Sequence, residues 1–168
     1  MIRVYTNTRH EKIIDDFLSS INLEHEIFTI KNMPKDELKP FDLGISYSFP
    51  RKIPVDVIKI PSKGFVNYHA APLPEYKGWR VYQEAIEKQE LNWGVSLHYI
   101  DEFYDTGPII KVIKIKLHCP GNTKQEIGGI TNWFKFHLFI QSVEKLYSDK
   151  LHAISQKIDP DELIEKNL

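Results

Sequence analysis

Two polar residues at the end of a predicted strand, together with a carboxylate in a later loop, are the side chains of this sequence best suited to chemistry. Asn67 and His69 stand two residues apart. Because strand side chains alternate between faces, both point to the same side of a sheet. An amide N–H and an imidazole placed in this way can face one carbonyl carbon, stabilising an oxyanion and handling a proton. Asp105, in the loop after the next strand, can hold the imidazole or relay a proton through water.

The spacing of apolar residues predicts the elements that must position this group. Helices are expected where apolar residues recur at three and four positions, and strands where they alternate or form short β-branched runs. Strands are expected over residues 2–5, 26–30, 42–47, 64–69, 95–100 and 109–117, and helices from 8 to 18, from 81 to 86 and from 123 to 143. Strand, helix, strand and strand in this order indicate an α/β fold with a largely parallel sheet.

Local signals refine three of these elements. Thr8 and Thr123 are each followed three residues later by Glu, a spacing typical of a capping box at a helix start. In the last strand the apolar positions change from even to odd, which predicts a β-bulge near Val112. Lys114 and Lys116 alternate with apolar residues there and place this strand near the sheet edge. Trp133 and Phe134 are expected in the core.

Composition bounds the class of protein. The 168 residues are 42% hydrophobic, enough for one core, and the formal net charge of -1 gives no general attraction to nucleic acid. Cys119 is the only cysteine, so no internal disulfide can form, and the first residues read as a strand rather than a signal peptide. We expect a cytoplasmic protein with no membrane span. His118 and Cys119 lack further ligands at metal spacing, so no metal site is expected.

Two segments around the polar group resemble the signature of the 10-formyltetrahydrofolate-dependent formyltransferases. They read Asn67-Tyr68-His69-Ala70-Ala71-Pro72-Leu73-Pro74-Glu75-Tyr76-Lys77-Gly78 and His98-Tyr99-Ile100-Asp101-Glu102-Phe103-Tyr104-Asp105-Thr106-Gly107-Pro108-Ile109-Ile110. That family includes glycinamide ribonucleotide, methionyl-tRNA and nucleotide-sugar formyltransferases. The resemblance implies a Rossmann-like formyltransferase fold, with a mostly parallel central sheet flanked by helices, and catalytic roles for Asn67, His69 and Asp105. Residues 1–150 would form the catalytic domain and 151–168 a C-terminal tail with a short strand over 153–156.

Each of the three residues also has a structural explanation when taken alone. His69 is one of seven histidines, and Asn67 could satisfy buried backbone groups. Asp105 could cap an ordinary turn. Their occurrence together, in the order of the family motif, favours the catalytic interpretation.

The resemblance also implies where 10-formyltetrahydrofolate would bind. Residues 48–53 lie where the family has its pterin-binding loop, and Asp101 to Tyr104 would form the opposite wall. The residues expected to contact folate are Phe49, Arg51, Ile53, Asp101 and Tyr104. Gly78 is expected to allow a close backbone approach. Lys52 reads as a surface charge.

Two departures from the family pattern bear on the acceptor. Asn67 comes early in the chain, which implies that the first half is shortened by about one strand–helix unit. Residues 70–72 are Ala-Ala-Pro where Pro-Ser-Leu is common, so a hydroxyl that often lines the site is absent. The residues considered for acceptor binding are Gly78, Trp79, Arg80 and Tyr82. Trp79 and Tyr82 could equally pack a helix onto the sheet.

Several acceptors fit this resemblance. A methionyl-tRNA enzyme is expected to have an RNA-binding domain and a basic surface, and a glycinamide ribonucleotide enzyme a glycine-rich phosphate loop, which residues 5–9 lack. The favoured acceptor is therefore a nucleotide-linked 4-amino-4,6-dideoxy sugar, acted on by a monomer or homodimer that binds no nucleic acid. Asn67 and a protonated His69 would stabilise the oxyanion. Glycinamide ribonucleotide formylation, 10-formyltetrahydrofolate hydrolysis and a non-catalytic folate-binding role remain as alternatives.

Overall fold

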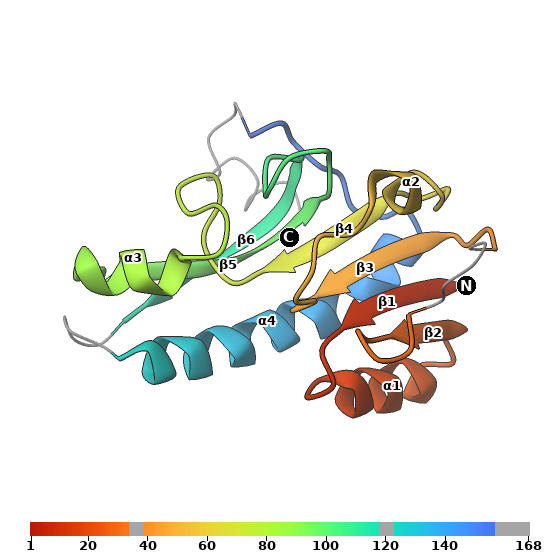
Figure 1. Cartoon of the computed structure of the whole chain (residues 1–168), viewed down its shortest axis with the longest axis horizontal. Helices are drawn as coiled ribbons and strands as arrows, with labels where there is room; N and C mark the ends of the chain where they lie inside the picture. Colours follow the sequence, from red (N-terminus) through yellow and green to blue (C-terminus); the bar gives the residue numbers. More distant parts are fainter. Residues whose placement is uncertain (34–38, 118–122, 157–168) are drawn as a thin grey trace.

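A computed structural model describes residues 1–33, 39–117 and 123–156, and its centre is one six-stranded sheet (Figure 1). The strands are β1 (Ile2–Thr6), β2 (His25–Phe28), β3 (Leu43–Tyr47), β4 (Phe65–His69), β5 (Asn92–Tyr99) and β6 (Ile109–Lys116). Their order is β2-β1-β3-β4-β5-β6. The first four are parallel, and β5 and β6 are antiparallel to their neighbours. The predicted α/β class and mostly parallel sheet are confirmed.

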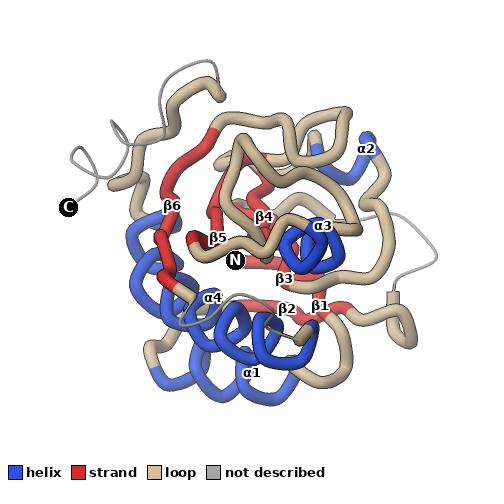
Figure 2. The backbone as a smooth tube through the Cα atoms, turned by 90° about the vertical axis from the view of Figure 1, so that its left-hand side faces the viewer, coloured by secondary structure: helices blue, strands red, loops and turns tan. Residues whose placement is uncertain are grey.

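Helices cover both faces of this sheet. They are α1 (Glu11–Ser20), α2 (Val55–Ile58), α3 (Val81–Glu87) and α4 (Lys124–Tyr147). Figure 2 shows α1 and α4 on the same side of the sheet. Phe17 of α1 and Tyr68 of β4 both pack edge-on against Phe139 of α4, with ring centroids 5.8 and 5.4 Å apart. The long α4 therefore supports the strand that carries Asn67 and His69.

A second apolar cluster lies apart from the main core and supports the predicted folate loop. It contains Tyr5, Phe41, Phe49, Ile53, Val57 and Phe65. Burial of each large side chain of this kind contributes about 1.5–3 kcal/mol. Phe49 and Ile53 are anchored here, and this fixes the backbone of the loop between β3 and α2.

The two predicted capping boxes have different outcomes. At α4 the box is confirmed, because Thr123 accepts the backbone N–H of Glu126 and the Glu126 carboxylate accepts that of Thr123. At α1 the prediction is wrong. The helix begins at Glu11, and Oδ1 of Asn7 accepts the backbone N–H groups of Arg9 and His10 at 3.0 and 3.2 Å. This turn, closed by an Asn side chain, makes His10 the N-cap residue and leaves Thr8 before the helix.

The edge strand β6 contains an irregularity and meets the C-terminal segment. Leu97 pairs with Lys111 and His98 with Ile109, so Ile110 is the extra residue, two positions before the predicted bulge at Val112. Ile109 and Ile154 exchange backbone hydrogen bonds of 2.8 Å in both directions. The segment predicted as a short strand thus pairs with the outer edge of β6 at one residue.

Three further sequence predictions concern single residues or the membrane. Trp133 is not a core residue as predicted, since it is 64% exposed and stacks on His137 at the surface of α4. His118 and Cys119, and with them the prediction of no metal site, lie outside the described residues. Within the described ranges, no helix combines the length and hydropathy needed to cross a bilayer.

Candidate active site

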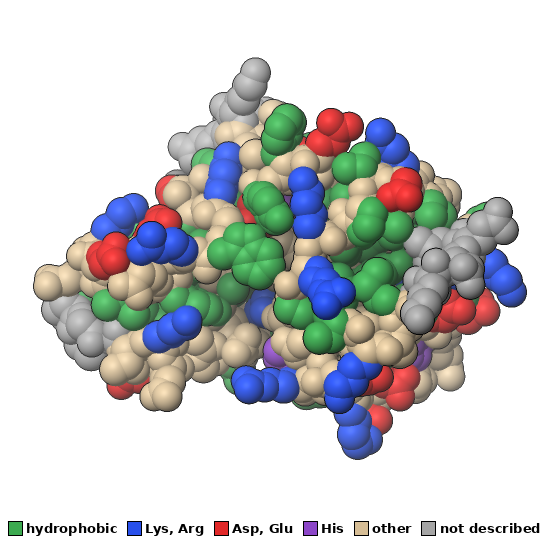
Figure 3. Space-filling view, viewed as in Figure 1, with side chains coloured by type: hydrophobic (Ala, Val, Ile, Leu, Met, Phe, Trp, Pro, Cys, Tyr) green, Lys and Arg blue, Asp and Glu red, His purple; other side chains and the backbone are tan. Residues whose placement is uncertain are grey.

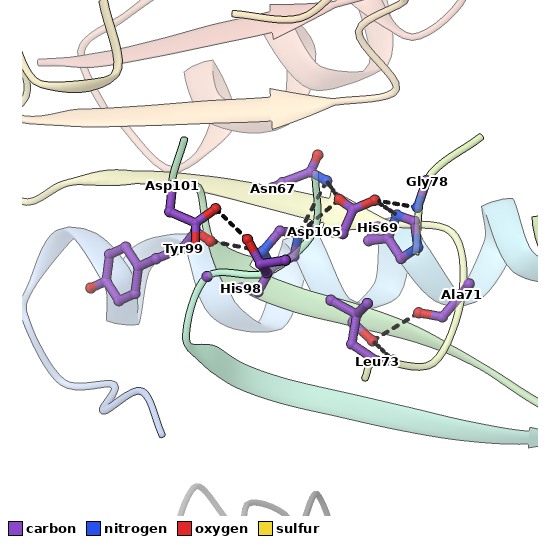
Figure 4. A network of polar contacts seen from close by, with 12 residues as sticks. Asn67, His69, Ala71, Leu73, Gly78, His98, Tyr99, Asp101 and Asp105 are labelled. Carbon is purple, nitrogen blue, oxygen red and sulfur yellow. Dashed lines mark hydrogen bonds and ion pairs between the residues drawn. The ribbon is translucent and has the colours of Figure 1, made fainter. Parts of the chain in front are cut away.

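Asn67, His69 and Asp105 meet at the centre of the site (Figure 4). Asn67 and His69 are on the same face of β4. Nδ2 of Asn67 donates to Oδ1 of Asp105 at 3.3 Å, and Nδ1 of His69 lies 3.4 Å from Oδ2 of the same carboxylate. Asp105 thus contacts both residues of β4 through its two oxygens, as the spacing of the motif required.

The loop that carries Asp105 is held in an unusual conformation. Asp105 has φ +54°, in the left-handed region that side chains other than glycine seldom occupy. Its Oδ2 accepts the backbone N–H of Gly78 at 2.8 Å. At Gly107 an added Cβ would overlap the backbone oxygen of Tyr99, so only glycine fits there. Oδ1 of Asp101 closes the loop by accepting the Thr106 hydroxyl at 2.6 Å.

The hydrogen bonds of His69 define its tautomer. Nε2 lies 2.8 Å from the carbonyl oxygen of Tyr76. A carbonyl can only accept, so Nε2 carries a proton, and in the neutral ring Nδ1 is a free proton acceptor beside Asp105. The side chain is buried, with 7% of the residue exposed, and this burial lowers the pKa of His69 although the charge of Asp105 opposes the shift. Burial thus favours the neutral form of the ring.

Asp105 is charged over the whole physiological range. Burial by itself would raise its pKa. The hydrogen bond with His98, the charges of His69 and His98 and the N–H of Gly78 together outweigh burial and lower the pKa of Asp105 to about 2. A carboxylate held in this way stabilises positive charge on a neighbouring imidazole.

His98 is a part of the site that the sequence analysis missed. It lies directly opposite Asn67 in the β4–β5 ladder, and it is almost fully buried. Its Nε2 is 3.2 Å from Nδ2 of Asn67 and 3.3 Å from Oδ1 of Asp105, while Nδ1 meets the carbonyl of Tyr99 at 2.7 Å. His98 therefore orients both partners. The available signal in the sequence was a histidine within a largely apolar strand, shortly before the loop that carries Asp105.

Lys135 of α4 is a second residue that the sequence analysis missed. Only 2% of it is exposed, yet it lines the same pocket as Asn67 and His69. Its Nζ donates to Oγ of Ser48 and lies 4.7 Å from the ring centroid of Tyr47. Burial lowers the pKa of Lys135 to about 8. Its signal was its place on the buried stripe of α4, which also contains Ile127, Thr131 and Leu138.

The pocket contains most of the residues predicted to contact folate or acceptor. The predicted residues that line it are Asn67, His69, Asp105, Phe49, Arg51, Ile53, Asp101, Tyr104, Gly78 and Trp79. Its two predicted walls are joined, since Lys52 donates to the carbonyl of Glu102 at 3.0 Å. On the face shown in Figure 3, hydrophobic side chains gather between lysine and arginine side chains. Such a mixture suits a flat aromatic ligand with charged groups.

Two predicted acceptor residues lie elsewhere. Arg80 is exposed, and its guanidinium is 3.9 Å from the Glu87 carboxylate on α3. Tyr82 packs against Trp93, with ring centroids 6.2 Å apart. Among the described residues, neither of the two lines the pocket. Trp79, in contrast, is 65% exposed beside Tyr104 at the pocket.

Gly78 does not pack closely against the described protein atoms. An added Cβ would meet none of them within 4 Å, so the predicted close approach of a ligand stays a prediction. The backbone itself requires glycine here, because φ is +83°. This conformation turns the N–H of Gly78 toward Asp105.

Fold and site together define an α/β protein with an amide, an imidazole and a carboxylate around one pocket. A family model described as "Formyl transferase" matches residues 30–142, more than half of the chain. The chain belongs to the formyl transferase family, and the Rossmann-like fold predicted from the resemblance is confirmed.

Known relatives differ in the acceptor that their names give. The methionyl-tRNA formyltransferase of Pelagibacter ubique is 32% identical over 110 residues, which are 66% of this chain and 35% of that protein. The chain thus spans about a third of the length of the curated relatives it matches.

Solved structures of similar fold include a sugar-nucleotide enzyme. The formyltransferase PseJ from Anoxybacillus kamchatkensis, solved in complex with UDP-4,6-dideoxy-4-formamido-L-AltNAc and tetrahydrofolate, has a TM-score of 0.79 and 26% identity, over 92% of this chain and 80% of that one. The phosphoribosylglycinamide formyltransferase from Streptococcus pneumoniae TIGR4 has a TM-score of 0.66 and 16% identity, over 87% and 98% of the two chains.

Proposed function

We propose that this chain transfers the formyl group of 10-formyltetrahydrofolate to the amine of a nucleotide-linked amino sugar of the 4-amino-4,6-dideoxy type. The observation that carries the proposal is the meeting of Asn67, His69 and Asp105 in one pocket. Membership of the formyl transferase family supports a role of this group in formyl transfer.

The folate would lie between the loop over residues 48–53 and the loop over residues 101–107. Phe49 and Ile53 offer apolar surface to a pterin ring, and Trp79 and Tyr104 offer aromatic faces beside it. Arg51 is exposed and can attract the anionic glutamate of the cofactor. The complex of PseJ with tetrahydrofolate supports this choice of co-substrate.

In the proposed reaction the neutral acceptor amine attacks the formyl carbon. Nδ1 of His69 takes the proton that the amine loses, while Asp105 stabilises the imidazolium that forms. The Asn67 side chain turns one of its N–H groups away from Asp105 or His98 and donates it to the oxyanion. The bond between the formyl carbon and N10 then breaks and N10 takes up a proton, which leaves a formamide and tetrahydrofolate.

The choice of a sugar acceptor is supported by the degree of structural similarity to PseJ. PseJ matches with a higher TM-score and identity than the ribonucleotide enzyme, over most of both chains. The net charge of -1 also argues against a large RNA acceptor.

The test is a turnover assay with defined acceptors. The protein is incubated with 10-formyltetrahydrofolate and, in separate reactions, uridine- or thymidine-diphosphate-linked 4-amino-4,6-dideoxy sugars, glycinamide ribonucleotide, methionyl-tRNA or no acceptor. Release of tetrahydrofolate is followed. We expect release only with an amino sugar, loss of turnover in His69→Ala with the fold intact, and full turnover in the control His137→Ala, which changes an exposed histidine.

Other outcomes would replace the proposal. Formylation of the ribonucleotide alone or of the tRNA alone would change the acceptor. Release of formate and tetrahydrofolate without any acceptor would indicate a hydrolase in which His69 and Asp105 activate water. Near-wild-type turnover in His69→Ala would remove this residue from the mechanism.

A further inference from the structure

Lys135 is a buried cation without a counter-ion in the described part of the chain. Burial is the cause of its lowered pKa, and no carboxylate there lies within ion-pair distance of its Nζ. Burying an ammonium group without an ionic partner costs several kcal/mol. An ammonium group buried at such a cost inside a pocket is suited to bind an anionic group of a ligand.

Lys135 reaches the pocket from the opposite face of the sheet. Tyr47 and Tyr68 pack on Phe139 of the same helix, so α4 lies on the far side of β3 and β4 from Asn67. The Lys135 side chain passes the end of β3 and meets Ser48, directly after the strand. Its charge lowers the pKa of His69 and of His10, and thus lies within electrostatic reach of both.

The surroundings of Lys135 leave further polar atoms without partners. Among the described residues, Nδ1 of His10 and the hydroxyl of Tyr47 are buried and form no hydrogen bond. The His10 ring lies edge-on to that of Tyr47 at 5.2 Å, and Nζ of Lys135 is over the same Tyr47 ring. Of these groups, Lys135 and Ser48 line the pocket that also contains Asn67 and His69. Together they can bind an oxygen-rich group.

We propose that Lys135 is a specificity-determining residue that binds an anionic oxygen of the acceptor. This inference rests on the proposed function, in which the nucleotide-linked sugar carries a diphosphate a few bonds away from its amine. A phosphoryl oxygen held by Lys135 and Ser48 would offset the desolvation of the ammonium group and place the amine toward His69. An amine acceptor without an anionic group would leave the charge of Lys135 uncompensated and would bind weakly.

A binding assay without folate tests this inference apart from turnover. Uridine diphosphate, thymidine diphosphate, uridine and glucuronic acid are titrated into the whole chain by calorimetry at pH 7. The variants are Lys135→Met, Lys135→Arg and the control Lys116→Met, which changes an exposed lysine on β6. We expect at least one diphosphate to bind wild type, Lys135→Arg and the control, and to bind Lys135→Met at least tenfold more weakly. Uridine should bind all four proteins equally weakly.

The same titration at pH 9.5 provides a test within the folded wild type. Lys135 loses its charge above pH 8, so binding of the diphosphate should weaken in wild type and persist in Lys135→Arg. The titratable groups around Lys135 are His10, His69 and Tyr47. Burial lowers the pKa of both histidines and raises that of Tyr47, so their charges stay constant over this range.

Each outcome decides the inference. If only glucuronic acid binds, and its binding depends on Lys135, the anion site is supported and its ligand is a carboxylate. Equal affinity of Lys135→Met and wild type, no pH dependence, or no binding of any probe would overturn it. Loss of formyl transfer with intact Lys135-dependent binding would count against the proposed function and leave the anion site in place.

Discussion

Nε2 of Gln156 lies 2.8 Å from the backbone oxygen of Asp105 and also 2.8 Å from that of Gly107. One amide of the C-terminal segment thus holds the loop that carries the Asp105 carboxylate on both sides of Thr106. The pairing of Ile154 with Ile109 fixes this amide in place. We therefore propose that the catalytic unit extends past the expected boundary at residue 150 and includes residues 151–156.

Gln156→Met should lower kcat roughly 10- to 100-fold with little change in KM. The substitution keeps the length of the side chain but removes both donors, so Asp105 loses part of its support while the pocket walls stay intact. Steady-state kinetics with saturating folate measures the effect, and Gln141→Met, an exposed residue of α4, is the matched control. Equal falls in kcat for both variants, or a change in KM alone, would contradict the positioning role.

Gly107→Ala and Gly78→Ala should differ sharply. At Gly107 a methyl group would overlap the backbone oxygen of Tyr99, so the loop must move and carry Asp105 away from His69. Activity should fall at least about 100-fold. At Gly78 the added methyl meets open space, and the cost is the left-handed backbone, about 1–2 kcal/mol. Thermal unfolding and turnover of both variants check this order, and equal activities would refute it.

Asp105→Asn should move the pH profile in a defined direction. The proposed mechanism needs neutral His69, so kcat/KM falls as the pH drops through the pKa of His69, which burial places below its ordinary 6.5. The charge of Asp105 raises that pKa, and its removal lowers the pKa further. The acid limb should shift to lower pH while the plateau falls about 100-fold or more. A profile from pH 4.5 to 8 measures both; a shift to higher pH would exclude this role of Asp105.

Local signals in the sequence predicted most strands and helices of the fold. The strand expected over residues 95–100 and the capping box of Thr123 depend on neighbours within a few residues, and both agree with the structure. The capping box of Thr8 failed because Asn7 closes a turn over Arg9 and His10, so the helix begins only at Glu11. Tyr82 shows the same limit, since helical spacing does not tell whether a ring faces a ligand or, as here, Trp93.

The site could be predicted only where its residues share a motif. Asn67 and His69 belong to one segment of the family motif and Asp105 to the other, and the structure brings the three residues together. His98 depends on the register between β4 and β5, which a sequence does not state. The role of Lys135 depends on how α4 passes the end of β3, which brings Lys135 next to Ser48, a residue 87 positions away in the sequence. The local patterns around His98 and Lys135 do not by themselves reveal these tertiary contacts.

The burial of Lys135 should also appear in the stability of the protein. The pKa of Lys135 is about 8 in the folded chain and near 10.5 in the unfolded chain. Below pH 8 both states are protonated, and the folded state bears the cost of a buried charge. Between pH 8 and 10.5 the unfolded chain binds more protons than the folded chain, so the free energy of unfolding from this group rises with pH.

Lys135→Met should therefore be more stable than wild type by about 1–3 kcal/mol at pH 7, with the difference shrinking toward pH 10.5. The thioether chain fills the same buried space and carries no charge, so the variant lacks the pH-dependent contribution of this group. Urea unfolding at pH 7, 8.5 and 10 compares the two proteins, with Lys116→Met as the exposed control. A variant less stable at pH 7, or a difference that does not change with pH, would mean that the ammonium group is compensated in the folded chain. A stabilised variant that also loses diphosphate binding would instead identify Lys135 as a residue kept for its ligand at the expense of stability.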